Sequence, residues 1–194
     1  MKDKCTTQNI IHQLPAGLMQ GDFRTELFGD RETKKVFAIS NGQTLPFSSL
    51  SVNHITALRR KLESDEIAQT DLKHLPPSQQ IEQFAFCVFG AADANADFSE
   101  TGELLADDNF MCSDNCKCLK WKSKNISVNN ISLSVRKLQI VKLLATDLCD
   151  KQIANQLDIS PSTLDTHKTQ LFKIFGVFSK SGLITQAINL KIIQ

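Results

Sequence analysis

The chain has 194 residues, enough for one or two small domains but few for a large enzyme fold. Hydrophobic residues make up 41% and charged residues 22%, as in an ordinary globular protein, and no apolar run approaches the roughly 20 residues that span a bilayer. The first residues lack the apolar segment that a signal peptide needs, so we expect a cytoplasmic protein with no membrane partner.

The net charge of +1 hides an asymmetry along the chain. Residues 132–194 contain eight Lys or Arg and four Asp, a net charge of +4, whereas the residues before them have 14 basic and 17 acidic side chains, a net charge of −3. A basic C-terminal part is typical of a domain that meets a polyanion, although chance variation in surface charge would give the same numbers.

Residues 1–90 have the pattern of a small α+β domain of unknown role. A strand is predicted over 35–39, ended by the turn pair Asn41-Gly42. Apolar residues at helical spacing predict a helix over 50–62, and Pro76-Pro77 opens another helix that should stop at Gly90. The segment has neither the acidic pair of a phosphoacceptor receiver domain nor a glycine-rich phosphate loop.

Residues 91–131 differ in composition, because they are rich in Ala, Asp, Asn and Ser and have no apolar periodicity. They are predicted to be an irregular segment or linker, ordered by something other than a hydrophobic core. Cys112, Cys116 and Cys118 crowd into this segment, and Cys87 ends the predicted helix before it. Four thiolates suit one tetrahedral structural zinc ion; unligated thiols, or a redox or iron–sulfur role, are the alternatives.

Residues 132–194 predict an all-α domain of four helices. Ser134 can cap the first helix, and the second runs from about 150 to 157. Ser160-Pro161 is a strong start signal for the third helix, which continues to Gly176. The fourth helix is defined by its apolar positions Leu183, Ile184, Ala187, Ile188 and Ile192.

The second and third helices have the spacing of a helix-turn-helix. Ala154 is small enough for the contact between two closely crossing helices, and Asp158 tolerates the positive φ that the tight turn needs. The wedge between the helices would be filled by Ile153, Leu157, Ile159 and Leu164. The third helix would then enter the major groove of DNA.

Six short motifs occur here in order and with consistent gaps: residues 133–136, 140–145, 150–154, 157–160, 162–167 and 175–177. Together they resemble the LuxR-type domain over about one third of the chain. The resemblance implies a bacterial, sequence-specific transcription regulator that binds double-stranded DNA and is not an enzyme. It also implies DNA contacts for Lys151, Ser162, Thr163, Asp165, Thr166, His167, Lys168, Gln170 and Lys173.

Structural roles compete with these assignments. His167 could be a packed residue that holds the helix pair, Lys168 and Lys173 could be ordinary solvated charges, and Thr163 could chiefly serve the first turn of its helix. The fourth helix could supply a small apolar face for a homodimer that reads two half-sites.

Three positions depart from the family pattern. Lys137 stands where a glutamate would complete a capping box, and Asp147 stands where a glycine usually follows the first helix. Asp165 replaces the common lysine of the recognition helix. A carboxylate there would repel phosphate or accept a hydrogen bond from cytosine N4, and we favour a position facing phosphate.

Two further readings concern the rest of the chain. Residues 84–118 resemble the upstream part of uncharacterised LuxR-type regulators from Bacteroides-like bacteria. They do not resemble the autoinducer-binding domain of LuxR, because that domain relies on tyrosine and this chain has none.

Two other functions stay open: an interaction adaptor whose helical domain never touches DNA, and a thiol oxidoreductase using Cys116 and Cys118. The second lacks an evident cation at a helix N-terminus to depress a thiol pKa.

Overall fold

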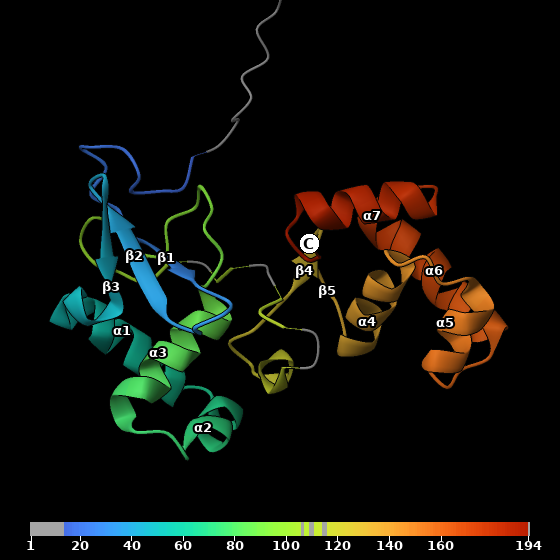
Figure 1. Cartoon of the computed structure of the whole chain (residues 1–194), viewed down its shortest axis with the longest axis horizontal. Helices are drawn as coiled ribbons and strands as arrows, with labels where there is room; N and C mark the ends of the chain where they lie inside the picture. Colours follow the sequence, from blue (N-terminus) through green and yellow to red (C-terminus); the bar gives the residue numbers. More distant parts are fainter. Residues whose placement is uncertain (1–13, 106, 109–110, 114–115, 194) are drawn as a thin grey trace, which may run out of the picture.

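The computed structural model of the chain describes residues 14–105, 107–108, 111–113 and 116–193. Figure 1 shows an α+β part built around a small sheet and a helical part formed by the C-terminal third, with short elements between them. This arrangement confirms the predicted fold class. Within the described residues, no helix combines the length and the apolar character needed to cross a membrane.

The N-terminal sheet has three antiparallel strands in the order β1 (Glu26–Gly29), β2 (Val36–Ser40) and β3 (Gln43–Pro46). Ser40 pairs with Gln43, so Asn41 and Gly42 form a two-residue turn with φ angles of 49° and 75°. Positive φ at both positions is typical of the hairpin turn that Asn-Gly favours. The predicted strand and its turn are therefore confirmed, whereas the four-residue strands on either side were too short to be predicted.

Helices α1 (Val52–Glu63), α2 (Glu66–Leu72) and α3 (Pro77–Val88) pack with this sheet, and the short 3-10 helix η1 (Phe47–Ser49) precedes them. The two predicted helices are confirmed, although α3 ends at Val88 with Phe89 as its C-cap, before Gly90. The sequence pattern did not predict α2. Its N-cap is Asp65, whose buried carboxylate accepts hydrogen bonds from the N–H groups of Ile67 and Ala68.

In the part of 91–131 that the structure describes, the regular elements are the short η2 (Lys117–Lys120), β4 (Ser127–Val128) and the beginning of β5 (Ile131–Ser132). The expectation that this segment lies outside a hydrophobic core is wrong. Phe98 and Trp121 are buried in the N-terminal core, and Ile126 and Val128 are buried in the C-terminal core. Periodicity missed them because an irregular backbone gives its apolar residues no regular spacing.

The two cores divide the molecule within residues 91–131, where Met111 belongs to the C-terminal core and Cys112 to the N-terminal one. The domain limits 1–90, 91–131 and 132–194 stay a prediction.

The C-terminal part consists of α4 (Val135–Leu144), α5 (Asp150–Gln156), α6 (Pro161–Phe175) and α7 (Lys180–Asn189), as predicted. The hydroxyls of Ser134 and Ser160 accept hydrogen bonds from the N–H groups of Lys137 and Thr163, which confirms both N-caps. Gly176 ends α6 with a φ of 66°. Ile192, expected inside the last helix, lies beyond its end and packs into the core.

Candidate nucleic-acid interface and thiol cluster

The helix-turn-helix is formed by α5, the turn 157–160 and α6. Ala154 is fully buried at the helix contact, together with Ile153 and Leu164, and the Ile159 N–H donates to the Ala154 carbonyl at 3.0 Å. Asp158 has a φ of 52°. These contacts confirm the predicted packing and the predicted left-handed turn residue.

Arg136 holds the end of α5 from the neighbouring helix α4. Its Nη1 donates to the Leu157 carbonyl at 3.2 Å, where the last carbonyls of a helix lack partners within the helix. The arginine belongs to the first of the six motifs, but this contact could not be predicted from the sequence, because Arg136 and Leu157 are 21 positions apart.

The outer face of α6 is polar and open to solvent. Ser162, Thr163, Thr166, Gln170 and Lys173 are all exposed, whereas Leu164, Leu171 and Ile174 are buried on the opposite face. A helix with one free polar face of this kind has the dimensions to enter a major groove.

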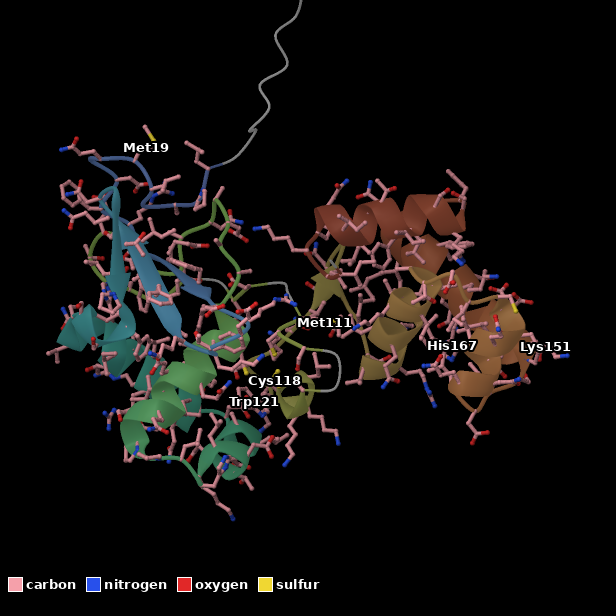
Figure 2. The ribbon with its side chains drawn as sticks, in the orientation of Figure 1. Met19, Met111, Cys118, Trp121, Lys151 and His167 are labelled. Atoms are coloured by element: carbon pink, nitrogen blue, oxygen red, sulfur yellow. The ribbon has the colours of Figure 1, made fainter. Side chains whose placement is uncertain are left out.

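Lys151 is an exposed basic residue on α5, the helix next to α6. It follows Asp150 in the first turn of α5 and is exposed, and Figure 2 shows it at the outer edge of the helical part. The structure therefore places Lys151 and the outer face of α6 on neighbouring elements of the helix-turn-helix.

The hydroxyls at the start of α6 serve the helix as well as its surface. Ser160 Oγ lies 2.8 Å from both Ser162 Oγ and Thr163 Oγ1, and Thr166 Oγ1 donates to the Ser162 carbonyl at 3.0 Å. Thr163 thus takes part in the capping network, as the structural interpretation expects. Its side chain and that of Ser162 are nevertheless exposed.

Lys168 is engaged by two carboxylates. Its Nζ lies 2.6 Å from Asp150 Oδ2 and 3.4 Å from Asp165 Oδ1. The hydrogen bond that Lys168 donates to Asp150, together with the negative charge of Asp150 and the contact with Asp165, raises the pKa of Lys168 above its usual value. The sequence did not predict Asp150 at this site, because it lies 18 positions from Lys168.

His167 lies on the inner side of α6. It is half-buried, and its Nδ1 atom is buried with no hydrogen-bond partner among the described residues. Figure 2 shows the residue within the group of helices, in contrast to Lys151. This is the position of a side chain that packs between helices.

Four cysteines lie close together at the N-terminal core. Cys87 comes from the end of α3 and Cys112, Cys116 and Cys118 from the irregular segment, and their sulfur atoms all lie within 4.8 Å of one another. Cys112 Sγ is 3.2 Å from Cys118 Sγ and 3.9 Å from Cys87 Sγ. All four are free thiols, and three of them are buried.

A buried lysine lies beside this thiol cluster, Cys87, Cys112, Cys116 and Cys118. Lys124 is buried, and its Nζ donates to the Cys87 carbonyl. Trp121 packs this segment against α3, because its ring is stacked on the ring of Phe84 with 5.8 Å between the ring centroids. Four sulfurs at such separations could hold a metal ion.

Comparison with known proteins identifies the C-terminal part. Residues 131–187 match the model of the luxR family of bacterial regulatory proteins. Similar relatives are the oxygen regulatory proteins NreC of Staphylococcus aureus strains JH9, JH1 and Mu3 / ATCC 700698, each 36% identical over 62 residues. The alignment covers 32% of this chain and 29% of each relative, so the chain spans less than a third of their length. No solved structure matches the chain.

These relatives align with the same C-terminal region that the family model matches. The resemblance of residues 84–118 to Bacteroides-type regulators stays a prediction.

Proposed function

Because residues 131–187 form a LuxR-family domain, we propose that this protein is a sequence-specific DNA-binding regulator of transcription. In this proposal α6 lies in the major groove and α5 crosses the phosphate backbone. The observation that carries it is the outer face of α6, which is polar and free while its apolar face is fully used in the helix-turn-helix core.

The residues divide by role. Ser162, Thr163 and Thr166 are the proposed contacts nearest the base edges, and Lys151, Gln170 and Lys173 the proposed phosphate contacts. Lys168 reaches a phosphate when its pairs with Asp150 and Asp165 open. Such partly exposed pairs are worth at most about 1 kcal/mol, so a phosphate can compete for the lysine. His167 positions α6 rather than contacting a base.

Duplex titration of the full chain tests this function. We expect binding at low salt that weakens steeply as salt is added, since each phosphate contact contributes about −0.9 to the log–log slope. The double variant Lys151→Ala/Lys173→Ala should weaken binding to every duplex and make the slope shallower by about two contacts. Lys73→Ala removes an exposed lysine of the N-terminal part and is the matched control, which should bind as the parent does.

A folded chain without DNA binding at low salt would refute the proposal. It would favour the interaction adaptor, in which the same helices bind another protein.

We place a homodimer contact on the surface of α7 and the turn before it. Leu183 and Ala187 are fully buried in the chain's own core, so they are not available to a partner. Phe178 is 100% exposed and Ile188 is 51% exposed, which leaves these two apolar side chains for a second copy. A two-fold dimer of this kind would present two recognition helices to two half-sites.

We further propose that the thiol cluster holds one structural zinc ion. Tetrahedral zinc with bonds of about 2.3 Å to sulfur separates its ligands by about 3.8 Å. Cys112 Sγ lies 3.2 Å from Cys118 Sγ and 3.9 Å from Cys87 Sγ, both close to this value, so only small shifts would bring these thiolates into position. Buried Lys124 would offset part of the negative charge of four thiolates around one Zn²⁺.

A further inference from the structure

Three buried carboxylates meet in the N-terminal part, in a group separate from the four thiols but next to them, since the Asp108 N–H donates to the Val88 carbonyl and Val88 follows Cys87. Glu26 lies on β1, Asp97 in the loop after α3, and Asp108 shortly before the cysteines of the irregular segment. Glu26 and Asp97 are fully buried and Asp108 is 6% exposed. One carboxylate oxygen from each residue lies within 4.8 Å of the others.

Backbone N–H groups fix the orientation of all three carboxylates. The N–H of Leu27 donates to Asp97 Oδ2 at 2.7 Å, that of Ala91 to Asp108 Oδ2 at 2.7 Å, and that of Asp93 to Glu26 Oε1 at 2.5 Å. Glu26 Oε2 and Asp97 Oδ1 are left buried with no hydrogen-bond partner among the described residues. The cluster therefore holds acceptor oxygens that no described residue satisfies.

Such a group is unstable as three bare anions. Burial without a partner is costly for a carboxylate, and like charges at this separation repel one another. Desolvation raises the pKa of Glu26 to about 9 and that of Asp108 to about 7. Protons can neutralise the charge, but they leave the shape of the site unexplained: oxygens from three separate segments converge on one point.

We propose that Glu26, Asp97 and Asp108 bind one hard divalent cation of the Ca²⁺ or Mg²⁺ class. Carboxylate oxygens are the ligands that these ions prefer, whereas the soft thiolates of the other cluster prefer zinc. A cation would be coordinated by the two unpartnered oxygens and would at the same time neutralise the charge of the cluster. It would also tie β1 to the irregular segment at two points, Asp97 and Asp108.

The site is not a continuous calcium-binding loop. Asp93, Asn95 and Asp97 have the spacing that opens an EF-hand loop, but Phe98 stands in place of its glycine and Leu104 in place of its final glutamate. Of the acids in this run, only Asp97 belongs to the cluster. The carboxylate of Asp93 instead accepts from the Asn95 N–H at 2.7 Å.

Calorimetric titration of the full chain tests the site. The protein is first passed over chelating resin and then titrated with CaCl₂ and, separately, with MgCl₂, and its melting temperature is measured with and without each salt. We expect one bound cation per chain, saturation within about 1 mM and a higher melting temperature. A stronger response to CaCl₂ assigns a large, oxygen-rich site, and a stronger response to MgCl₂ assigns a small, partly hydrated one.

Asp97→Asn should weaken the affinity at least about tenfold, because it removes a charged ligand. The asparagine can still accept a hydrogen bond from the Leu27 N–H. Glu100→Gln is the matched control in the same loop, since Glu100 is exposed, and its binding should equal that of the parent. If Asp97→Asn does not fold, the same titration of Glu26→Gln tests the site, and its affinity should fall in the same way.

Absence of binding by either cation up to about 10 mM would overturn the proposal, and so would unchanged affinity in the folded variant. In both cases the carboxylates are neutralised by protons, with a contribution from the charges of Lys124 and Lys191.

Discussion

Asp165 lies on the solvent side of α6, where its side chain is 71% exposed and its carboxylate is 3.4 Å from Lys168 Nζ. Lys168 has a closer partner in Asp150, at 2.6 Å, on the neighbouring helix α5. The carboxylate of Asp165 is therefore not needed to hold the helix pair together. A substitution of Asp165 should change the binding of DNA to the outer face of α6 rather than the stability of the domain.

We expect Asp165→Lys to tighten binding to specific and scrambled duplexes alike. The substitution adds two positive units at one point, so the salt slope should steepen by about one phosphate contact. Titration of both duplexes at two salt concentrations measures this. Asp147→Lys makes the same charge change at an exposed position outside α6 and should have a smaller effect.

A base-reading role for Asp165 would give a different result. The substitution would then remove roughly 1–3 kcal/mol of discrimination at a single base pair and leave non-specific binding intact or stronger. If neither duplex responds to the charge reversal, α6 does not lie in the groove.

At the scale of the elements, the turn between α5 and α6 depends on one backbone conformation. Asp158 has a φ of 52°, a region that costs an ordinary side chain about 1–2 kcal/mol and that aspartate tolerates better. The turn sets the crossing of α5 and α6, because only residues 157–160 separate the two helices. Stability and the placement of α6 are thus linked at this residue.

We predict that Asp158→Ala lowers the free energy of unfolding by about 1 kcal/mol. Asp158→Gly should keep the parent's stability or exceed it slightly, because glycine adopts positive φ without strain. Urea denaturation of the two variants measures the difference, and Asp147→Ala at an exposed position provides the control. Equal stability of the alanine and glycine variants would show that the turn conformation contributes nothing.

At the scale of the whole molecule, the irregular segment holds the two cores together. It supplies Trp121 to the N-terminal core and Val128 to the C-terminal one. Two further contacts join the parts: Arg31 Nη2 donates to the Met111 carbonyl at 3.0 Å, and Lys191 Nζ donates to the Ala92 carbonyl at 2.5 Å. Order in this segment should therefore affect both parts of the chain.

We predict that protein purified without chelator contains about one zinc per chain, and that chelation lowers its melting temperature. Cys118→Ser should lose the metal and melt earlier, because a buried sulfur ligand is removed from the cluster. Cys149→Ser is the matched control, since Cys149 is exposed and outside the cluster, and it should keep the metal. A metal-free preparation with unchanged melting would rule out structural zinc.

The amino-acid sequence by itself determined the elements that depend on neighbours in the chain. Capping by Ser160, the positive φ of Asp158 and the end of α6 at Gly176 are all local, because each involves residues within one or two helical turns. These local signals, with the apolar spacing, were enough to predict the four C-terminal helices and their crossing. The sequence also indicated that the four cysteines form one group. It did not predict the geometry of their sulfur atoms.

Only the tertiary structure decided which distant side chains meet. Asp150 reaches Lys168 because α5 and α6 cross, and Glu26 reaches Asp97 because β1 lies beside the loop after α3. The same holds for Trp121, which fills the N-terminal core from an irregular segment. No periodicity records such contacts, because they arise from the packing of whole elements against one another rather than from the conformational preferences of residues close in the chain.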